Sequence, residues 1–161
     1  MKKSIYKSNE EIAEILIDTY GEIIYKLAFL YLGNQNMADE IFQAVFYKAM
    51  KNPSRFQQEN NEKNWLIRTT IQACKKLINP NLYKEIEAES QVNGHLYPLL
   101  MQLPSKYREV MVLSYYVNLA DVEIAAILRI AQSSIPRYLF KGEQTLQKII
   151  EERGDDDETS N

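Results

Sequence analysis

The sequence predicts an all-α protein that folds as two small helical domains joined by a flexible linker. Three observations support this fold class. In every periodic segment the apolar residues recur at steps of three and four, which is typical of one buried face of a helix. No segment alternates apolar and polar residues over the length of a strand. The 161 residues include only five glycines and five prolines, too few for the many turns of an all-β chain.

Two helices are expected in the first 53 residues. Ser8 and Glu11 have the spacing of a capping box, and the helix that follows ends at Gly33-Asn34. Asn36 is expected to cap the second helix, which ends at Asn52-Pro53. The predicted apolar stripes are Ile12, Ile15, Leu16, Tyr20, Ile23, Ile24, Leu27, Ala28 and Tyr31 in the first helix, and Ile41, Phe42, Val45, Phe46, Ala49 and Met50 in the second.

A third helix is expected from about Glu62 to Ile78, after a polar loop at residues 54–64. Its predicted buried stripe is Trp65, Leu66, Thr69, Ala73 and Leu77. Because Trp65 lies on that stripe, we expect it in the core rather than stacked on a base. The single cysteine, Cys74, is expected to be a small buried or half-buried residue.

The domain boundary is predicted at residues 80–98. This segment contains two prolines, a glycine and only scattered apolar residues, which is typical of a linker. It separates a first domain at residues 8–79 from a second at 99–152. Within the second domain we expect helices over about 105–117, 121–128 and 133–152.

The charge is concentrated at the end of the chain. Residues 151–161 carry six acids and one base, so the rest of the chain, from totals of 19 bases and 22 acids, holds 18 bases and 16 acids. A nearly neutral body gives no strong electrostatic case for nucleic-acid binding. Residues 153–161 have no apolar residues to bury, and we expect an acidic, disordered tail.

Several classes of function are disfavoured by composition. One histidine and one cysteine leave little material for a catalytic site or a metal site, and no phosphate-binding loop is present in the sequence. We therefore expect no enzyme activity and no cofactor. No run of about 18 apolar residues exists, so we expect no membrane insertion and a cytoplasmic location.

Residues 121–140 fit a helix-turn-helix. Such a motif needs a small residue where the helices cross, here Ala125, and apolar residues that face a shared core. The apolar positions are Ile124, Leu128, Ile130, Ile135 and Tyr138. Arg129 occupies the turn position that often holds glycine, so a left-handed backbone there would be mildly strained. Spacing alone fits a DNA-binding motif and a helical hairpin without nucleic-acid contacts equally well.

Two blocks of residues carry a resemblance to a known family. They are Leu103-Pro104, Tyr107-Arg108-Glu109-Val110 and Glu123-Ile124-Ala125 with Leu128 in the second half, and residues 38–49 and Asn64-Trp65-Leu66-Ile67-Arg68 in the first. Together they resemble the extracytoplasmic-function (group 4) sigma factors of the sigma-70 family. The resemblance spans about residues 10–150, and both blocks stand in the family's order.

The resemblance implies sigma region 2 and region 4 domains, the latter a helix-turn-helix, and promoter-specific initiation by RNA polymerase. The polymerase-binding residues would be Asp39, Glu40, Gln43, Tyr47 and Lys48. The single-stranded −10 element would be held by Asn60, Asn61, Lys63, Asn64, Arg68, Gln72, Lys75 and Lys76. The −35 element would be contacted by Gln132, Ser133, Ser134, Arg137 and Lys141.

The resemblance also implies partners: RNA polymerase core, promoter DNA and, for many members, an anti-sigma factor. The last helix is poor in bases where the family has a run of them, so we expect weak DNA binding by the second domain alone. This feature motivates an alternative function. A sigma-like co-regulator would bind polymerase without initiating transcription independently.

Overall fold

The computed structural model describes residues 8–51, 62–77 and 97–159, and side chains as far as residue 154. All of the regular structure in these ranges is helical, which confirms the all-α prediction. The chain divides into two compact units, Met1–Ile78 and Asn79–Asn161. The predicted linker lies outside the described residues apart from residues 97 and 98.

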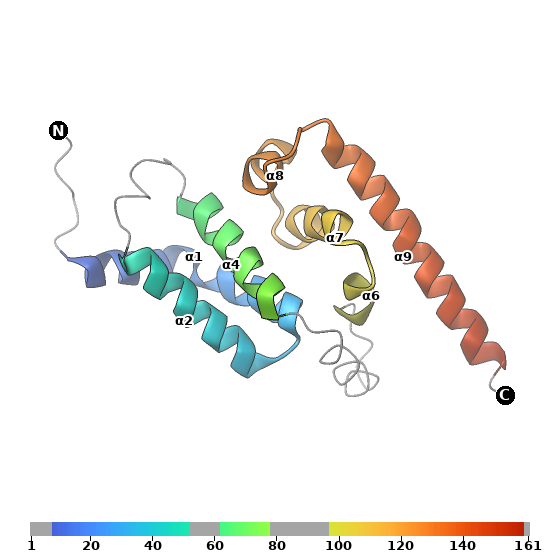
Figure 1. The fold of residues 1–161 in the computed structure, drawn as a ribbon, viewed down its shortest axis with the longest axis horizontal. Coiled ribbons are helices and arrows are strands. Elements are labelled where there is room, and N and C mark those ends of the chain that lie inside the picture. Colours follow the sequence, from blue (N-terminus) through green and yellow to red (C-terminus); the bar gives the residue numbers. More distant parts are fainter. Residues whose placement is uncertain (1–7, 52–61, 78–96, 160–161) are drawn as a thin grey trace. The chain divides into compact units, whose positions relative to one another are not determined.

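The first unit begins with a helical hairpin (Figure 1). Helix α1 (Asn9–Leu32) and helix α2 (Gln35–Lys51) are joined by only two residues, which makes them antiparallel neighbours. The Ser8 hydroxyl accepts the Glu11 N–H at 3.2 Å, as predicted. Gly33 ends α1 in the left-handed conformation, with φ of 61°, and donates its N–H to the Phe29 carbonyl at 2.8 Å.

The cap of α2 differs from the prediction. The Asn34 side chain, and not that of Asn36, accepts the Met37 N–H, at 3.0 Å. The left-handed turn at Gly33 reverses the chain at once, so the second helix begins two residues after the first ends. Asn36 is therefore already inside the helix.

Helix α4 (Glu62–Leu77) completes the first unit and packs against both α1 and α2. Its buried residues are Asn64, Trp65, Leu66, Ile67, Thr70, Ile71 and Cys74. The predicted stripe was only partly right. Leu77, at its end, is 39% exposed, and Thr69 and Ala73 are half-buried. A helix that contacts two neighbours buries a wider arc than one stripe, and this arc includes Ile67 and Ile71.

The structure begins α4 at Glu62, so the last three residues of the predicted loop at 54–64 are helical. The rest of that loop lies outside the described residues. Trp65 is 7% exposed and Cys74 fully buried, which confirms both as core residues.

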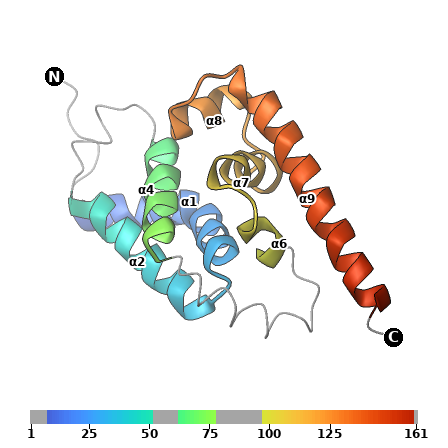
Figure 2. The same ribbon diagram turned by 45° about the vertical axis from the view of Figure 1, so that its right-hand side comes forward.

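The second unit contains α6 (Tyr97–Met101), α7 (Ser105–Met111), α8 (Asp121–Leu128) and α9 (Ser134–Thr159) (Figure 2). A single turn of π-helix, η1 (Val112–Tyr116), continues α7. Helix α9 packs against α6, α7 and α8, and therefore joins the unit together.

The π-turn changes the register of the helix predicted over 105–117. The Val117 N–H bonds to the Val112 carbonyl five residues back, at 3.2 Å. The extra residue in this turn shifts the side chains that follow it around the helix. Tyr115, within this turn, is 51% exposed, and its hydroxyl donates to the Glu143 carboxylate on α9.

Helix α9 is longer than predicted. It continues to Thr159 and includes residues that the sequence assigned to a disordered tail. No proline interrupts the chain after Pro136, so nothing forces the backbone to leave the helix at Glu152. The disordered-tail prediction is therefore wrong for the backbone up to Thr159.

Helices α7 and α9 approach each other closely at Gly142. A Cβ built at this buried residue would lie 2.6 Å from Met111 Sδ and 3.3 Å from Tyr107 Cβ. At Gly154 on the same helix, a Cβ would meet no atom within 4 Å. A side chain at Gly142 would thus force the Met111 side chain to move, whereas at Gly154 it would displace nothing.

We predict that Gly142→Ala destabilises the second unit. Overpacking of this kind costs about 1–3 kcal/mol, more than the ~0.5–1 kcal/mol that alanine gains over glycine inside a helix. The matched control Gly154→Ala should leave the unit as stable or slightly more so. Amide hydrogen exchange in α7 measures both, and equal protection in the two variants would contradict the packing argument.

Cys74 gives a second prediction, on the first unit. Burial raises the pKa of its thiol to about 12, because the thiolate would be desolvated. The folded protein should therefore resist a thiol-alkylating reagent at neutral or mildly alkaline pH. The stability that the neutral thiol contributes is present below the unfolded pKa and is lost as the pH rises above it.

The labelling rate of Cys74 should equal the unfolding rate reported by the fluorescence of Trp65, the single tryptophan, in the same unit. Fast labelling while the Trp65 signal stays native would show that the thiol is accessible in the folded state.

Candidate functional site

Helices α8 and α9 form the predicted helix-turn-helix. Arg129 ends α8 in the left-handed conformation, with φ of 56° and ψ of 47°, as the sequence suggested for this turn. Ile124 and Ile135 are fully buried on the two sides of the turn. Ile127 is also buried, whereas the predicted core position Leu128 is only half-buried.

The start of α8 is stabilised by one half of a capping box. The Glu123 carboxylate accepts the Ala120 N–H at 3.1 Å, but Ala120 has no side-chain oxygen to return the bond. The helix still begins at Asp121 and ends at Leu128, the bounds that the sequence predicts.

The outer face at the beginning of α9 carries the predicted −35 residues. Gln132, Ser133, Arg137 and Lys141 are exposed, and Ser134 is half-buried. Pro136 lies in the first turn, where its missing N–H removes no helical bond. This face is polar, accessible and carries two cations, so it can donate hydrogen bonds to bases or phosphates.

Lys106 and Tyr138 lie beside this face and were not among the predicted site residues. The Lys106 ammonium, on α7, lies 5.1 Å from the centre of the Tyr107 ring and 5.7 Å from that of Tyr138. The Arg137 guanidinium lies 5.5 Å from the same Tyr138 ring. Thirty-two positions separate Lys106 from Tyr138, so no local pattern in the sequence predicts their contact.

The predicted −10 residues are split by the structure. On α4, Gln72, Lys75 and Lys76 are exposed, and Lys63 and Arg68 are half-buried. Asn64 is only 7% exposed, so its side chain faces the core and not the surface that the prediction requires. Asn60 and Asn61 lie outside the described residues.

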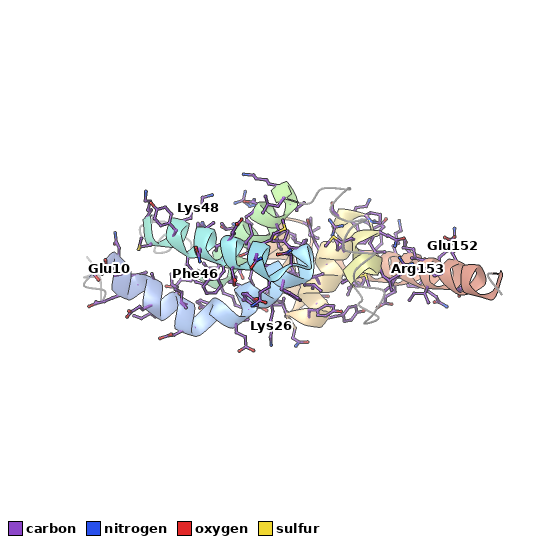
Figure 3. All side chains as sticks on the ribbon, turned by 90° about the horizontal axis from the view of Figure 1, so that it is seen from below. Glu10, Lys26, Phe46, Lys48, Glu152 and Arg153 are labelled. Carbon is purple, nitrogen blue, oxygen red and sulfur yellow. The ribbon has the colours of Figure 1, made fainter. Side chains whose placement is uncertain are left out.

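The predicted polymerase-binding residues share the exposed side of α2. Asp39, Glu40, Gln43, Tyr47 and Lys48 are all exposed. Figure 3 shows Lys48 pointing away from α1, whereas Phe46 lies between α2 and α1 and is 4% exposed. Tyr47 is 54% exposed, and the Lys51 ammonium lies 4.6 Å from the centre of its ring.

In the described ranges, no three histidine, cysteine or acidic side chains gather as they would around a metal ion. Within those ranges, no helix combines the length and apolar character needed to cross a membrane.

The hydrogen bond to Glu143 raises the pKa of the Tyr115 hydroxyl, which keeps this exposed group protonated.

The family match and the similar proteins of known sequence agree with one another. The profile of Sigma-70 region 2 matches residues 16–79. The ECF RNA polymerase sigma factor SigW of Bacillus subtilis (strain 168) is 25% identical and covers 92% of this chain and 94% of its own length. SigX of the same organism, also an ECF sigma factor, is 22% identical over 88% of this chain and 85% of its own length.

Two solved structures share the fold. CnrH in complex with the cytosolic domain of CnrY has a TM-score of 0.72 at 17% identity, covering 88% of this chain and 89% of the other. The sigma factor RpoE from Bartonella quintana, in complex with the anti-sigma factor NepR, has a TM-score of 0.63 at 14% identity. It covers 88% of this chain and 98% of the other.

The fold and the exposed helix-turn-helix thus define a helical protein of two compact units. Residues 16–79 match the Sigma-70 region 2 family, and over most of its length the chain is similar to extracytoplasmic-function RNA polymerase sigma factors.

The turn of the helix-turn-helix gives a prediction on stability. A left-handed backbone costs a residue with a Cβ about 1–2 kcal/mol, and glycine avoids most of that cost. Arg129→Gly should therefore stabilise the second unit by about 0.5–1 kcal/mol. The control Arg129→Ala removes the same exposed side chain but keeps the Cβ, and should give no gain.

Chemical denaturation followed by far-ultraviolet circular dichroism compares the two variants. Equal stability of the glycine and alanine variants would mean that the turn is not strained.

Proposed function

We propose that this sigma factor binds core RNA polymerase through the exposed side of α2 and holds promoter DNA with α4 and α9. In this proposal α4 binds the −10 element as single strand, and the start of α9 contacts the −35 element in the major groove. The observation that carries the proposal is that each unit closes its own apolar core and still presents a polar helix face to solvent.

The α2 surface supports a docking role by its composition. It combines an exposed aromatic side chain, Tyr47, with acids at Asp39 and Glu40 and a base at Lys48. Aromatic residues that are exposed in the free protein are frequent anchors of protein interfaces, and surrounding charges set orientation. Tyr47 lies in the second half of α2 and is 54% exposed.

The α4 surface supports binding of single-stranded DNA. Lys75 and Lys76 provide cations for phosphates and Gln72 provides an amide for base edges, all on the exposed side of one helix. With Asn64 facing the core, the proposed set on this helix is reduced to Lys63, Arg68, Gln72, Lys75 and Lys76.

The start of α9 supports major-groove binding. The exposed Arg137 can donate two hydrogen bonds to a guanine, and Lys141 can pair with a phosphate one turn further along. Only these two cations stand among the predicted −35 residues, so affinity for DNA depends on help from elsewhere in the complex.

We also propose the remaining partners and the location. CnrH and RpoE were each solved with a bound protein, the cytosolic domain of CnrY and the anti-sigma factor NepR, and we propose that an anti-sigma factor binds this chain as well. Its work requires no catalysis of its own and takes place in the cytoplasm. The co-regulator alternative is not favoured, because the relatives named as sigma factors match over nearly their whole length.

The proposal predicts that the protein co-purifies with bacterial core polymerase and supports run-off transcription from a subset of genomic fragments. Tyr47→Ala should weaken core binding tenfold or more, the typical loss when an aromatic anchor is truncated. Phe29→Ala is the matched control, because Phe29 is a similarly exposed aromatic residue, at 44%, on α1.

A pull-down with purified core polymerase measures binding, and run-off transcription measures specific initiation. A folded wild-type protein that neither binds core nor starts transcripts at defined positions would overturn the proposed function. Equal losses in the two variants would remove the docking role of the α2 surface.

A further inference from the structure

Two cations from different helices share one aromatic ring in the second unit. Lys106 stands at the beginning of α7 and Arg137 in the first turns of α9, and both lie within 5.7 Å of the centre of the Tyr138 ring. The Tyr138 ring is held in turn by Tyr107, edge to face, with the ring centres 5.6 Å apart. We call these four residues the tyrosine–cation cluster.

The tyrosines are fixed while the cations remain accessible. Tyr107 and Tyr138 are half-buried between α7 and α9, whereas Lys106 and Arg137 are exposed. A cation that rests on an aromatic face keeps its charge and its hydrogen-bond donors, and loses part of its conformational freedom before any ligand arrives.

Over the part of the chain that the structure describes, no carboxylate forms an ion pair with Lys106 or Arg137. Two positive charges near one ring repel each other, and an anion bound beside them would reduce that repulsion. The cluster therefore has the charge, the donors and the rigidity of an anion-binding site.

We propose that Lys106 binds a backbone phosphate of the DNA that α9 contacts, with Tyr138 as the residue that positions both Lys106 and the neighbouring Arg137. This inference rests on the proposed function and adds to it a DNA contact from α7, outside the helix-turn-helix. Lys106 thereby supplies a third cation to a motif whose own DNA-binding face has only two, Arg137 and Lys141.

DNA suits this cluster better than a small free anion. The cations stand on the surface, where the attraction for a single ion is screened beyond about 8 Å at physiological ionic strength. A polyanion gains further free energy because each neutralised phosphate releases condensed counterions. The neighbouring α9 face would also hold the duplex in place, so a backbone phosphate would already lie near the cluster when the contact forms.

The test uses the salt dependence of DNA binding by four variants of the full chain. Lys106→Gln removes one cation, and Tyr138→Leu removes the ring on which both cations rest. Tyr138→Phe keeps the ring and removes only the hydroxyl. Lys148→Gln, further along α9, is the matched charge control, because it lies about 16 Å along the helix axis from Arg137 and has no ring contact.

The slope of log affinity against log salt is measured with holoenzyme on a promoter fragment that the wild type transcribes, and with the free chain on a short duplex. Lys106→Gln should reduce the magnitude of the slope by about 1, or roughly threefold in affinity for a fourfold change in salt, whereas Lys148→Gln should match the wild type. Tyr138→Leu should also reduce the magnitude of the slope, whereas Tyr138→Phe should leave it at the wild-type value.

A Lys106→Gln slope equal to that of the wild type in both assays would overturn the proposal, even if Tyr138→Leu simply misfolds. Titration with inorganic phosphate is the competing arm: if it binds the wild type and not Lys106→Gln while the DNA slopes agree, the cluster is a small-anion site instead. Failure of the proposed function looks different, because the wild-type holoenzyme would then transcribe no fragment, and the free-chain assay would still decide the role of Lys106.

Discussion

Each unit of this protein depends on burial of apolar side chains between a few short helices, and the surfaces left outside are the ones available for binding. A domain of about 80 residues buries a smaller share of its surface than a larger one, so nearly every helix must commit one side to the core. In the first unit that side includes Ile24, Tyr31 and Leu66, each fully buried. The opposite side of α2 and the end of α4 are consequently polar.

In the second unit the need to bury apolar side chains between short helices brings α7 and α9 close together. Gly142 allows α7 and α9 to approach so closely that a single added carbon would collide with Met111. This approach brings Lys106 of α7 beside Tyr138 of α9, next to Arg137. Close packing in the interior of the unit thus accompanies the meeting of these two cations at its surface.

Much of this architecture could be predicted from local patterns. The Ser8 and Gly33 caps, the bounds of α8 and the left-handed Arg129 follow from residue type and spacing, because each depends on neighbours within a few positions. Asn34 and Asn36 could not be separated this way, since both are good caps two residues apart. The sequence also missed the wide buried arc of α4, the π-turn before Asn118 and the helical continuation of α9, because these depend on partners and packing that no local period records. The contact between Lys106 and Tyr138 is non-local in the same sense.

Hydroxyl-radical footprinting of the assembled complex tests the central claim most directly. In the free protein Tyr47 on α2 is exposed and Tyr138 on α9 is half-buried, so both should be modified there, Tyr138 more slowly. Tyr47 should become protected when core polymerase binds, and Tyr138 only when promoter DNA is added. Unchanged modification of both tyrosines in an assembly that transcribes would contradict the claim that these two outward faces are the binding surfaces.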